Sequence, residues 1–273
     1  MSKKIAIITI NYNDKEGLKK TIDSVISQSW QNFEFLVIDG NSTDGGKVVI
    51  QQYESHLDYW ISEPDKGVYN AMNKGIRAAK GDFVLFLNSG DVLHDKDVLE
   101  KVNASINNEY GIYYGDVIIK KPNSERHKKY PDVLSFSYFY TGALCHQSCF
   151  IKRSLFKEYF YYNEEYKIYS DGEFFIYTIC GKNVPYKHLD LIISDYDFTG
   201  ISSNPKYSAI HDSERMQTIA KYFPLFAEDY KVLSKLNSKR TQQLFYIEKF
   251  PFAWKFLKGF LNLILVFLPK PKK

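Results

Sequence analysis

Four short apolar runs alternate with amphipathic segments over the first 106 residues of the chain. Apolar runs of four to seven residues without polar alternation are typical of strands that are buried on both faces. Between them apolar residues recur at helical spacing, as at Leu18, Ile22 and Val25. This alternation predicts an α/β fold with a mostly parallel sheet covered by helices. The expected strands are residues 5–10, 33–39, 58–62 and 83–87, and the expected helices lie near 14–27, 47–54, 68–79 and 97–106.

Polar residues follow three of these strands at the point where each run ends. They are the segments 9–11 (TIN), 39–42 (DGNS) and 88–91 (NSGD). Since parallel strands that are joined by helices end at the same edge of a sheet, we expect these segments to lie together. Ligands of such sheets bind beyond the carboxyl ends of the strands.

Beyond residue 110 the pattern changes to shorter β-type pieces and then to helices. Strands are expected at 112–120, 147–152 and 184–197, with a helix beginning just after Asp171 and another at 209–222. We therefore divide the chain into a catalytic domain at 1–205, with halves 1–110 and 111–205, and a helical C-terminal extension at 206–273.

Composition fits one large globular domain, or one domain with an appendage. The chain has 273 residues, of which 44% are apolar and 25% charged. Its three cysteines form neither a disulfide framework nor a zinc pattern, which favours a reducing cytoplasm. The first residues (MSKKIAIITI) are expected to form a strand rather than a signal peptide.

Charge is distributed unevenly between the body and the extension. Residues 206–273 hold 13 Lys and Arg against 5 Asp and Glu, whereas the rest of the chain is acidic. The end of the extension is rich in Phe and Leu, so we expect a membrane surface rather than nucleic acid as its partner. Only ten uncharged residues, 259–268, follow the last internal lysine, which is too few for a spanning helix. A helix lying in the plane of the interface is expected, with packing on the protein itself or on a second subunit as the alternative.

Two nucleotide-binding loops are absent from the chain. No G-x-G-x-x-G follows the first strand, and no G-x-x-x-x-G-K-[ST] occurs, which argues against dinucleotide dehydrogenases and P-loop enzymes. A diphosphate can also be held through a divalent cation bound by a carboxylate at a strand end. Asp91 is placed for that role, although the segment 88–91 could also be an ordinary polar turn.

Four segments taken together resemble the family 2 glycosyltransferases of the GT-A fold. They are ITINYN at the first strand, VIDGNSTDG at the second, EPDKGVYNAMNKG before a helix, and GDFVLFLNSGD at the fourth strand. The resemblance covers roughly residues 3–200, and the relatives it suggests assemble bacterial surface polysaccharides such as capsule, O-antigen and colanic acid. It implies a Rossmann-like sheet and transfer of a sugar from a nucleotide donor.

The resemblance assigns donor-binding roles to five residues of the first half. Thr9 and Asn11 would line the nucleotide pocket, and Asp39 would accept a hydrogen bond from the base, typically uracil. Asp65 and Asn73 would lie near the nucleotide or the donor sugar. Local structure offers other roles: a turn cap for Asp39, a turn for Asp65 and a solvated helix position for Asn73.

The same resemblance places FLNSGD at the family's D-x-D signature. Asn88 and Ser89 would then contact the donor, and Asp91 would coordinate Mn²⁺ or Mg²⁺ bound to the diphosphate. Asn88 stands where the family usually has an acid, so Asp91 is the only carboxylate of this segment. Fewer anionic ligands imply a weaker cation site, completed by water and the donor's phosphates.

A transferase of this kind also needs a base for the acceptor hydroxyl. The family has an acid at the start of a helix in the second half, and Asp171 matches it, although Asp171 could equally cap that helix. Glu173 is the nearby substitute. His146 is a candidate donor or acceptor contact, although a single His is more often structural. We reject a metal cluster of Cys145, His146 and Cys149 because no further ligand follows at a suitable spacing.

The sequence thus predicts an inverting, metal-dependent hexosyltransferase on the inner face of the cell membrane. It would transfer one sugar from a UDP-sugar to a lipid-linked saccharide, since the Q-x-x-R-W signature of processive members is absent. The alternatives are a sugar nucleotidyltransferase, which would need a Gly-rich basic loop after the first strand, and a nucleotide-sugar-binding scaffold without turnover. Neither the sugar nor the acceptor hydroxyl follows from the sequence.

Overall fold

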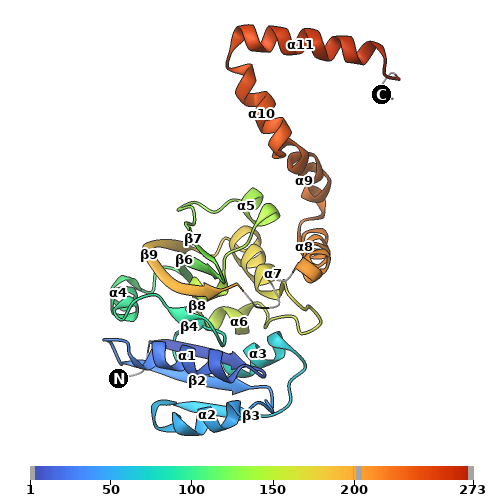
Figure 1. Cartoon of the computed structure of the whole chain (residues 1–273). Helices are drawn as coiled ribbons and strands as arrows, with labels where there is room; N and C mark the ends of the chain where they lie inside the picture. Colours follow the sequence, from blue (N-terminus) through green and yellow to red (C-terminus); the bar gives the residue numbers. More distant parts are fainter. Residues whose placement is uncertain (1–3, 199, 201–204, 270–273) are drawn as a thin grey trace. The chain divides into compact units, whose positions relative to one another are not determined.

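A computed structural model describes residues 4–198, 200 and 205–269 of the chain (Figure 1). The chain divides into two compact units, one up to Tyr222 and one from Phe223 onward. Helix α8 (Ser208–Tyr222) closes the first unit. This unit therefore includes a helix that the sequence analysis assigned to the C-terminal extension.

The first four strands of the first unit confirm the predicted parallel arrangement. They lie in the order β3 (Tyr59–Ser62), β2 (Phe33–Asp39), β1 (Ile5–Asn11) and β4 (Phe83–Phe86), and each neighbouring pair is parallel. Every residue of β1 and β2 is buried, as expected for strands covered on both faces. The helices of this half are α1 (Lys15–Ile26), α2 (Gly46–Gln52), α3 (Val68–Ala78) and α4 (Val98–Ser105), with a 3₁₀ turn, η1, at Glu54–His56.

The two faces of this sheet are covered by different helices. Ile5 and Ile7 of β1 belong to a core cluster that includes Leu18 and Ile22 of α1. On the other face, Gly75 of α3 packs so closely on Ile8 that a Cβ at position 75 would lie 2.4 Å from Ile8 Cγ2. Alternate residues of one strand therefore face opposite helices, as the period of two requires.

Beyond β4 the sheet becomes mixed. It continues through β8, β6, β9 and β5, where β8 is antiparallel to both of its neighbours and β9 is parallel to β6. Strands β5 and β7 pair antiparallel with β9 and β6. The bounds are β5 (Val92–Leu93), β6 (Ile112–Lys121), β7 (Ser124–Lys128), β8 (Cys149–Lys152) and β9 (Tyr186–Asp197).

Helix α7 (Ser170–Ile176) begins next to Asp171, as predicted, and continues as a π-helical turn, η3 (Tyr177–Gly181). Strands β5 and β7 and the short helices α5 (Phe136–Thr141) and α6 (Ser154–Glu158) were not predicted. The remaining short elements are the 3₁₀ turns η2 (His146–Ser148) and η5 (Pro205–Tyr207).

Up to residue 269, the second unit contains the helices α9 (Pro224–Leu236), α10 (Lys239–Glu248) and α11 (Pro251–Val266). None of the residues of α11 is buried, and Phe252 and Phe256 are 92% and 80% exposed. Among the residues that the structure describes, no helix has both the length and the apolar character needed to cross a membrane.

Candidate functional site

The polar ends of β1, β2 and β4 meet, as the sequence predicted. Asn11 pairs with Asp39 in the register of β1 and β2, and Ser89 N–H donates to Ile10 O over 3.1 Å. Asn11 joins the three ends, because its Nδ2 donates to Asp39 Oδ1 over 2.7 Å and its Oδ1 accepts from Ser89 Oγ over 2.9 Å.

The carboxylate of Asp39 is surrounded by donors from the protein. Asn11 and the Ser42 hydroxyl donate to Oδ1, and the Ser42 N–H and the Ser62 hydroxyl donate to Oδ2. Burial alone would raise the pKa of Asp39, but these donors hold it below 3.8. All four acceptor positions are used, so a direct contact with a nucleotide base requires Ser42 or Ser62 to release the carboxylate.

None of the five predicted donor contacts of the first half, Thr9, Asn11, Asp39, Asp65 and Asn73, lines the pocket described below. Thr9 is fully buried, and its Oγ1 has no partner among the described residues. Asp65 accepts from Gly67 N–H over 2.9 Å, and a Cβ at Gly40 would lie 2.5 Å from its Oδ2. Asp65 is thus close to the end of β2.

Asn73 of α3 is held by contacts within the protein. Its Nδ2 donates to Tyr162 O and Glu164 Oε1, and its Oδ1 accepts from Tyr162 N–H. The side chain is 1% exposed, so its amide is used in holding the segment that precedes α7. One acceptor position on Oδ1 remains, and the expected place of Asn73 near the nucleotide or the donor sugar stays a prediction.

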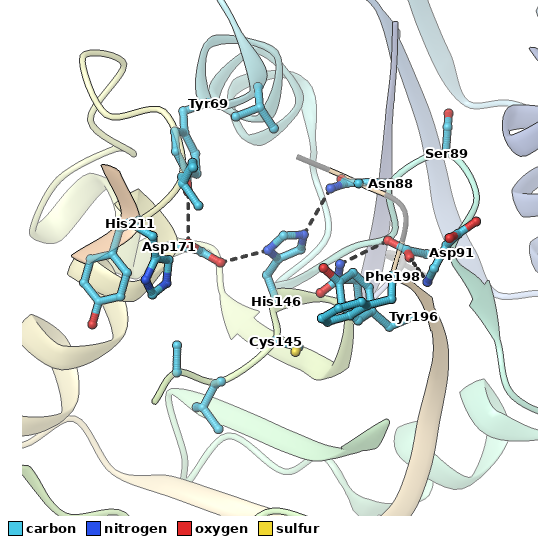
Figure 2. Close-up of a pocket in the computed structure, with 18 of the residues that line it drawn as sticks. Tyr69, Asn88, Ser89, Asp91, Cys145, His146, Asp171, Tyr196, Phe198 and His211 are labelled. Carbon is cyan, nitrogen blue, oxygen red and sulfur yellow. Dashed lines mark hydrogen bonds and ion pairs between the residues drawn. The ribbon is translucent and has the colours of Figure 1, made fainter. Parts of the chain in front are cut away.

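A pocket of about 520 Å³ lies beside the end of β4 (Figure 2). Four predicted site residues line it: Asn88, Ser89, Asp91 and Asp171. The second half contributes the segment around His146 and the end of β9, with Tyr196 and Asp197. The pocket thus joins the strand-end residues of the first half with the expected base of the second half.

Asp91 is almost completely buried, and each of its oxygens accepts a hydrogen bond. Asp197 N–H donates to Oδ1 over 2.9 Å, and Gln147 Nε2 donates to Oδ2 over 3.1 Å. Burial raises the pKa of Asp91 to about 7 and the nearby carboxylate of Asp197 adds to the rise, although the two donors and the proximity of His146 oppose it.

Gly90 brings Asp197 close to this segment. Its φ of +95° is one that side-chain-bearing residues rarely adopt, and a Cβ at position 90 would lie 3.2 Å from Asp197 Oδ2. The carboxylate of Asp197 therefore borders the space that a side chain at position 90 would need.

The side chains at this site could bind a divalent cation only if phosphate oxygens and water supplied the remaining ligands. Among the described residues no cluster of three or more His, Cys, Asp or Glu side chains could hold a metal ion. Asp91 keeps a second acceptor position on each oxygen, and its repulsion from Asp197 would be relieved by a positive charge nearby. Hard oxygen ligands of this kind suit Mg²⁺ or Mn²⁺ when phosphates and water complete the set.

Asp171 lies at the start of α7 with its carboxylate in the pocket. Oδ1 accepts from Tyr69 Oη over 3.0 Å and from Gly172 N–H over 2.9 Å, and Oδ2 accepts from His146 Nδ1 over 2.9 Å. Burial alone would raise the pKa of Asp171, but His146 and Tyr69 outweigh it and hold the pKa below 3.8. Asp171 is therefore an anion at neutral pH, and one acceptor position on Oδ2 remains.

Glu173 does not share this position. It is 1% exposed, and its Oε1 accepts from Lys221 Nζ and Tyr222 Oη of α8, both over 3.0 Å. It does not line the pocket. The substitute base that the sequence offered thus links α7 to α8 instead.

Sequence reasoning undervalued His146 and missed Gln147 and Tyr69. His146 and Gln147 are consecutive in η2, yet one contacts Asp171 and the other Asp91. The only signal was a His-Gln pair within an otherwise apolar stretch, LCHQSCF, and nothing in it indicates partners that lie 25 and 56 residues away.

Known proteins resemble the chain in both sequence and fold. An uncharacterized glycosyltransferase of Mycobacterium tuberculosis is 30% identical over 228 residues, which cover 81% of this chain and 85% of the relative. The putative teichuronic acid biosynthesis glycosyltransferase TuaG of Bacillus subtilis is 37% identical over 102 residues, or 36% of this chain and 39% of TuaG. The crystal structure of S. aureus TarS 1–349 in complex with UDP has a TM-score of 0.60 at 19% identity, covering 89% of this chain and 78% of that structure.

The profile of one protein family, described as glycosyl transferase family 2, matches residues 6–160. These residues hold β1 to β4, the segment 88–91 and the His146–Gln147 pair, so the match includes most of the pocket. Together with the 30% identity to a glycosyltransferase over most of both chains, it confirms the family and the GT-A fold expected from the sequence. The chain belongs to glycosyl transferase family 2.

Proposed function

We propose that this glycosyltransferase is an inverting hexosyltransferase that moves one sugar from a UDP-sugar to a lipid-linked saccharide during surface polysaccharide synthesis. The observation that carries the proposal is the placement of two carboxylates in one pocket. Asp91 follows the central strand β4, and Asp171 lies on α7, with His146 and Gln147 between them (Figure 2). In this proposal Asp91 serves the donor and Asp171 serves the acceptor.

The donor half of the proposal rests on the network at the strand ends. Asn11, Asp39 and Ser42 hold one another, and Ser89 connects them to the pocket. We assign the nucleotide to the region of Thr9, Asn11, Asp39 and Asp65, and the diphosphate to the region of Asn88, Ser89 and Asp91. TarS has been solved with UDP, which supports a uridine nucleotide here.

Asp91 would hold a divalent cation together with the donor's phosphate oxygens and water. The chemistry that such an ion supplies is neutralisation of the charge that develops on the leaving diphosphate. Asp91 is suited to this role because its desolvated carboxylate lies next to a second acid, Asp197, so that positive charge at this point is favoured.

Asp171 would accept the proton of the acceptor hydroxyl. In a single displacement the acceptor oxygen forms a bond to the anomeric carbon while the bond from that carbon to the diphosphate oxygen breaks, which inverts the configuration. The hydroxyl proton passes to the remaining acceptor position on Asp171 Oδ2. The lowered pKa makes Asp171 a weak base, so its contribution depends on orientation as well as on basicity.

A lipid-linked acceptor agrees with the properties of α11 and with TuaG, whose name places it in teichuronic acid synthesis. The exposed Phe and Leu residues of α11 lie beside Lys255 and Lys258, a combination that suits the interface of an anionic membrane. We propose that this helix holds the enzyme on the cytoplasmic face of the membrane.

The proposal is tested by donor screening followed by turnover. The purified full chain is heated with a panel of nucleotide sugars, with and without Mn²⁺, and the donor is the compound that raises the melting temperature most. Release of UDP from that donor in the presence of an acceptor, with formation of an inverted glycoside, supports the function. Binding without any turnover would instead indicate a scaffold, and formation of pyrophosphate from UTP and a sugar phosphate would indicate a nucleotidyltransferase.

A further inference from the structure

His146 lies between the residue at the D-x-D position and the expected base. Its side chain is 15% exposed, and its ring meets Phe86 of β4 edge to face, with centroids 6.3 Å apart. Nδ1 lies 2.9 Å from Asp171 Oδ2, and Nε2 lies 3.1 Å from Asn88 Nδ2. Both ring nitrogens thus have a partner, and the ring plane is fixed by three contacts.

These partners select one tautomer of the ring. An ionised carboxylate only accepts hydrogen bonds, so Nδ1 must carry a proton toward Asp171. As the amide of Asn88 is oriented, its nitrogen donates to Nε2. In this arrangement Nδ1 carries the proton that His146 shares with Asp171, and Nε2 is the acceptor.

The contact with His146 also determines which acceptor position of the Asp171 carboxylate remains free. Tyr69 and Gly172 occupy both acceptor positions of Oδ1, and His146 occupies one position of Oδ2. The single position that is left lies on the oxygen that His146 holds. Rotation of the carboxylate would break three hydrogen bonds at once.

We propose that His146 is a positioning residue for the transfer reaction, acting through its Nδ1–H to aim the free acceptor position of Asp171 at the acceptor hydroxyl. The inference rests on the proposed function and names a residue to which that function assigned no part. Asn88 contributes from the other side, because its amide nitrogen donates to Nε2. A positively charged ring beside Asp171 would weaken the base by stabilising its anion.

Three substitutions at position 146 distinguish the role of Nδ1 from that of Nε2. Asn at position 146 can place an amide N–H where Nδ1 lies, Gln can place its amide near Nε2, and Ala removes both. We expect His146→Asn to keep kcat within about fivefold of the native value, whereas His146→Gln and His146→Ala lose about a hundredfold, the scale of losing an oriented base. The KM for the donor should change less than about twofold in all three, because Asp171 acts on the acceptor.

The outcomes that overturn the proposal are equally specific. If Gln preserves kcat and Asn does not, the important atom is Nε2. If all three variants lose kcat together with thermal stability, His146 is only structural. Equal activity in all three would also refute a positioning role.

A spectroscopic measurement tests the geometry without any turnover. In ¹⁵N spectra of the histidine rings at neutral pH, His146, assigned by its absence in His146→Asn, should show a protonated Nδ1 and an unprotonated Nε2. Protonation at both nitrogens, or at Nε2 alone, would overturn the inference. If the native protein turned over no nucleotide sugar, the proposed function would fail, and the ¹⁵N result would still decide the tautomer.

Discussion

Gln147 Nε2 donates a hydrogen bond to Asp91 Oδ2 over 3.1 Å, within a site where the preceding residue holds Asp171. The two acids come from opposite halves of the first unit, at the end of β4 and at the start of α7. Because the consecutive residues His146 and Gln147 of η2 contact Asp171 and Asp91, this short piece of backbone helps to set the distance between the two acids. Since each acid has its own contact, each can be tested with its own variant.

Replacing Asp91 with Asn should reduce transfer by about a hundredfold or more, because the shape of the side chain is kept and its charge is lost. Donor binding should also stop responding to Mn²⁺, as measured by calorimetry with and without the ion. Asp95→Asn is the matched control, since Asp95 is an exposed acid on the same connection. Native activity that persists in excess chelator would rule out the cation role of Asp91.

The pH dependence of the protein's stability should reveal the raised pKa of the buried Asp91. Its folded pKa, about 7, is raised above the unfolded value of 3.8, so its stabilising contribution is complete below pH 3.8 and is lost as the pH rises through 7. The shift of about three units corresponds to about 4 kcal/mol at most. Urea unfolding is measured without divalent cations. Between pH 4 and pH 8 the free energy of unfolding of the native protein should fall relative to that of Asp91→Asn. A constant difference between the two proteins would contradict the raised pKa.

Asp171→Asn should lower kcat by about a hundredfold and leave donor affinity nearly unchanged, because an amide cannot take the acceptor proton. The variant keeps an oxygen that can accept from Tyr69 and Gly172. Steady-state kinetics with each substrate varied in turn is the measurement. Loss of donor binding with turnover retained at saturation would show that Asp171 belongs to the donor site instead.

Asn88→Asp should change the protonation of His146. A carboxylate opposite Nε2 can accept a hydrogen bond, so the ring would lie between two acids and take up a second proton. We expect both ring nitrogens to be protonated at pH 7 in ¹⁵N spectra, together with a lower kcat. A ring that stays neutral in this variant would show that Asn88 does not select the tautomer.

Removal of residues 249–273, which deletes α11, should leave a folded protein with native donor affinity that no longer sediments with anionic vesicles. Lys255→Glu with Lys258→Glu should weaken sedimentation in the full chain, and added salt should do the same. The control is Lys20→Glu with Lys47→Glu, two exposed lysines of the first unit. A native chain that ignores anionic vesicles at low salt, or a truncated chain that unfolds, would refute the membrane role.

The sequence predicted those parts of the fold that depend on local pattern. The buried runs of β1 and β2 and the polar residues that end them are visible as single stretches, and parallel connectivity alone brings Asn11 and Asp39 together. Asp171 was singled out through the family resemblance and its local position at the start of a helix, and it lines the pocket, while its role as the base stays a prediction. Asp14, the first residue of the helix expected near 14–27, caps α1 by accepting from Gly17 N–H over 3.0 Å.

What the sequence did not predict depends on contacts between distant segments. Asn73 has the same residue type and helical setting whether it faces a donor or Tyr162, which lies 89 residues further on. Strand β7 escaped notice because four of its five residues are exposed, so it has no apolar alternation. The helix expected near 68–79 ends at Ala78, and position 81 lacks a side chain because a Cβ would lie 2.8 Å from Ala6 N.

The closeness of Gly90 to Asp197 has an evolutionary consequence. A side chain at position 90 and the carboxylate of Asp197 compete for one volume, and the backbone of Gly90 is itself unfavourable for other residues. A homologue with an acid at position 90 would need a strained or altered local backbone and a shift of the carboxylate that corresponds to Asp197. The two positions should co-vary across the family, so that the negative charge beside Asp91 moves between two places in the chain while its location in the pocket is kept.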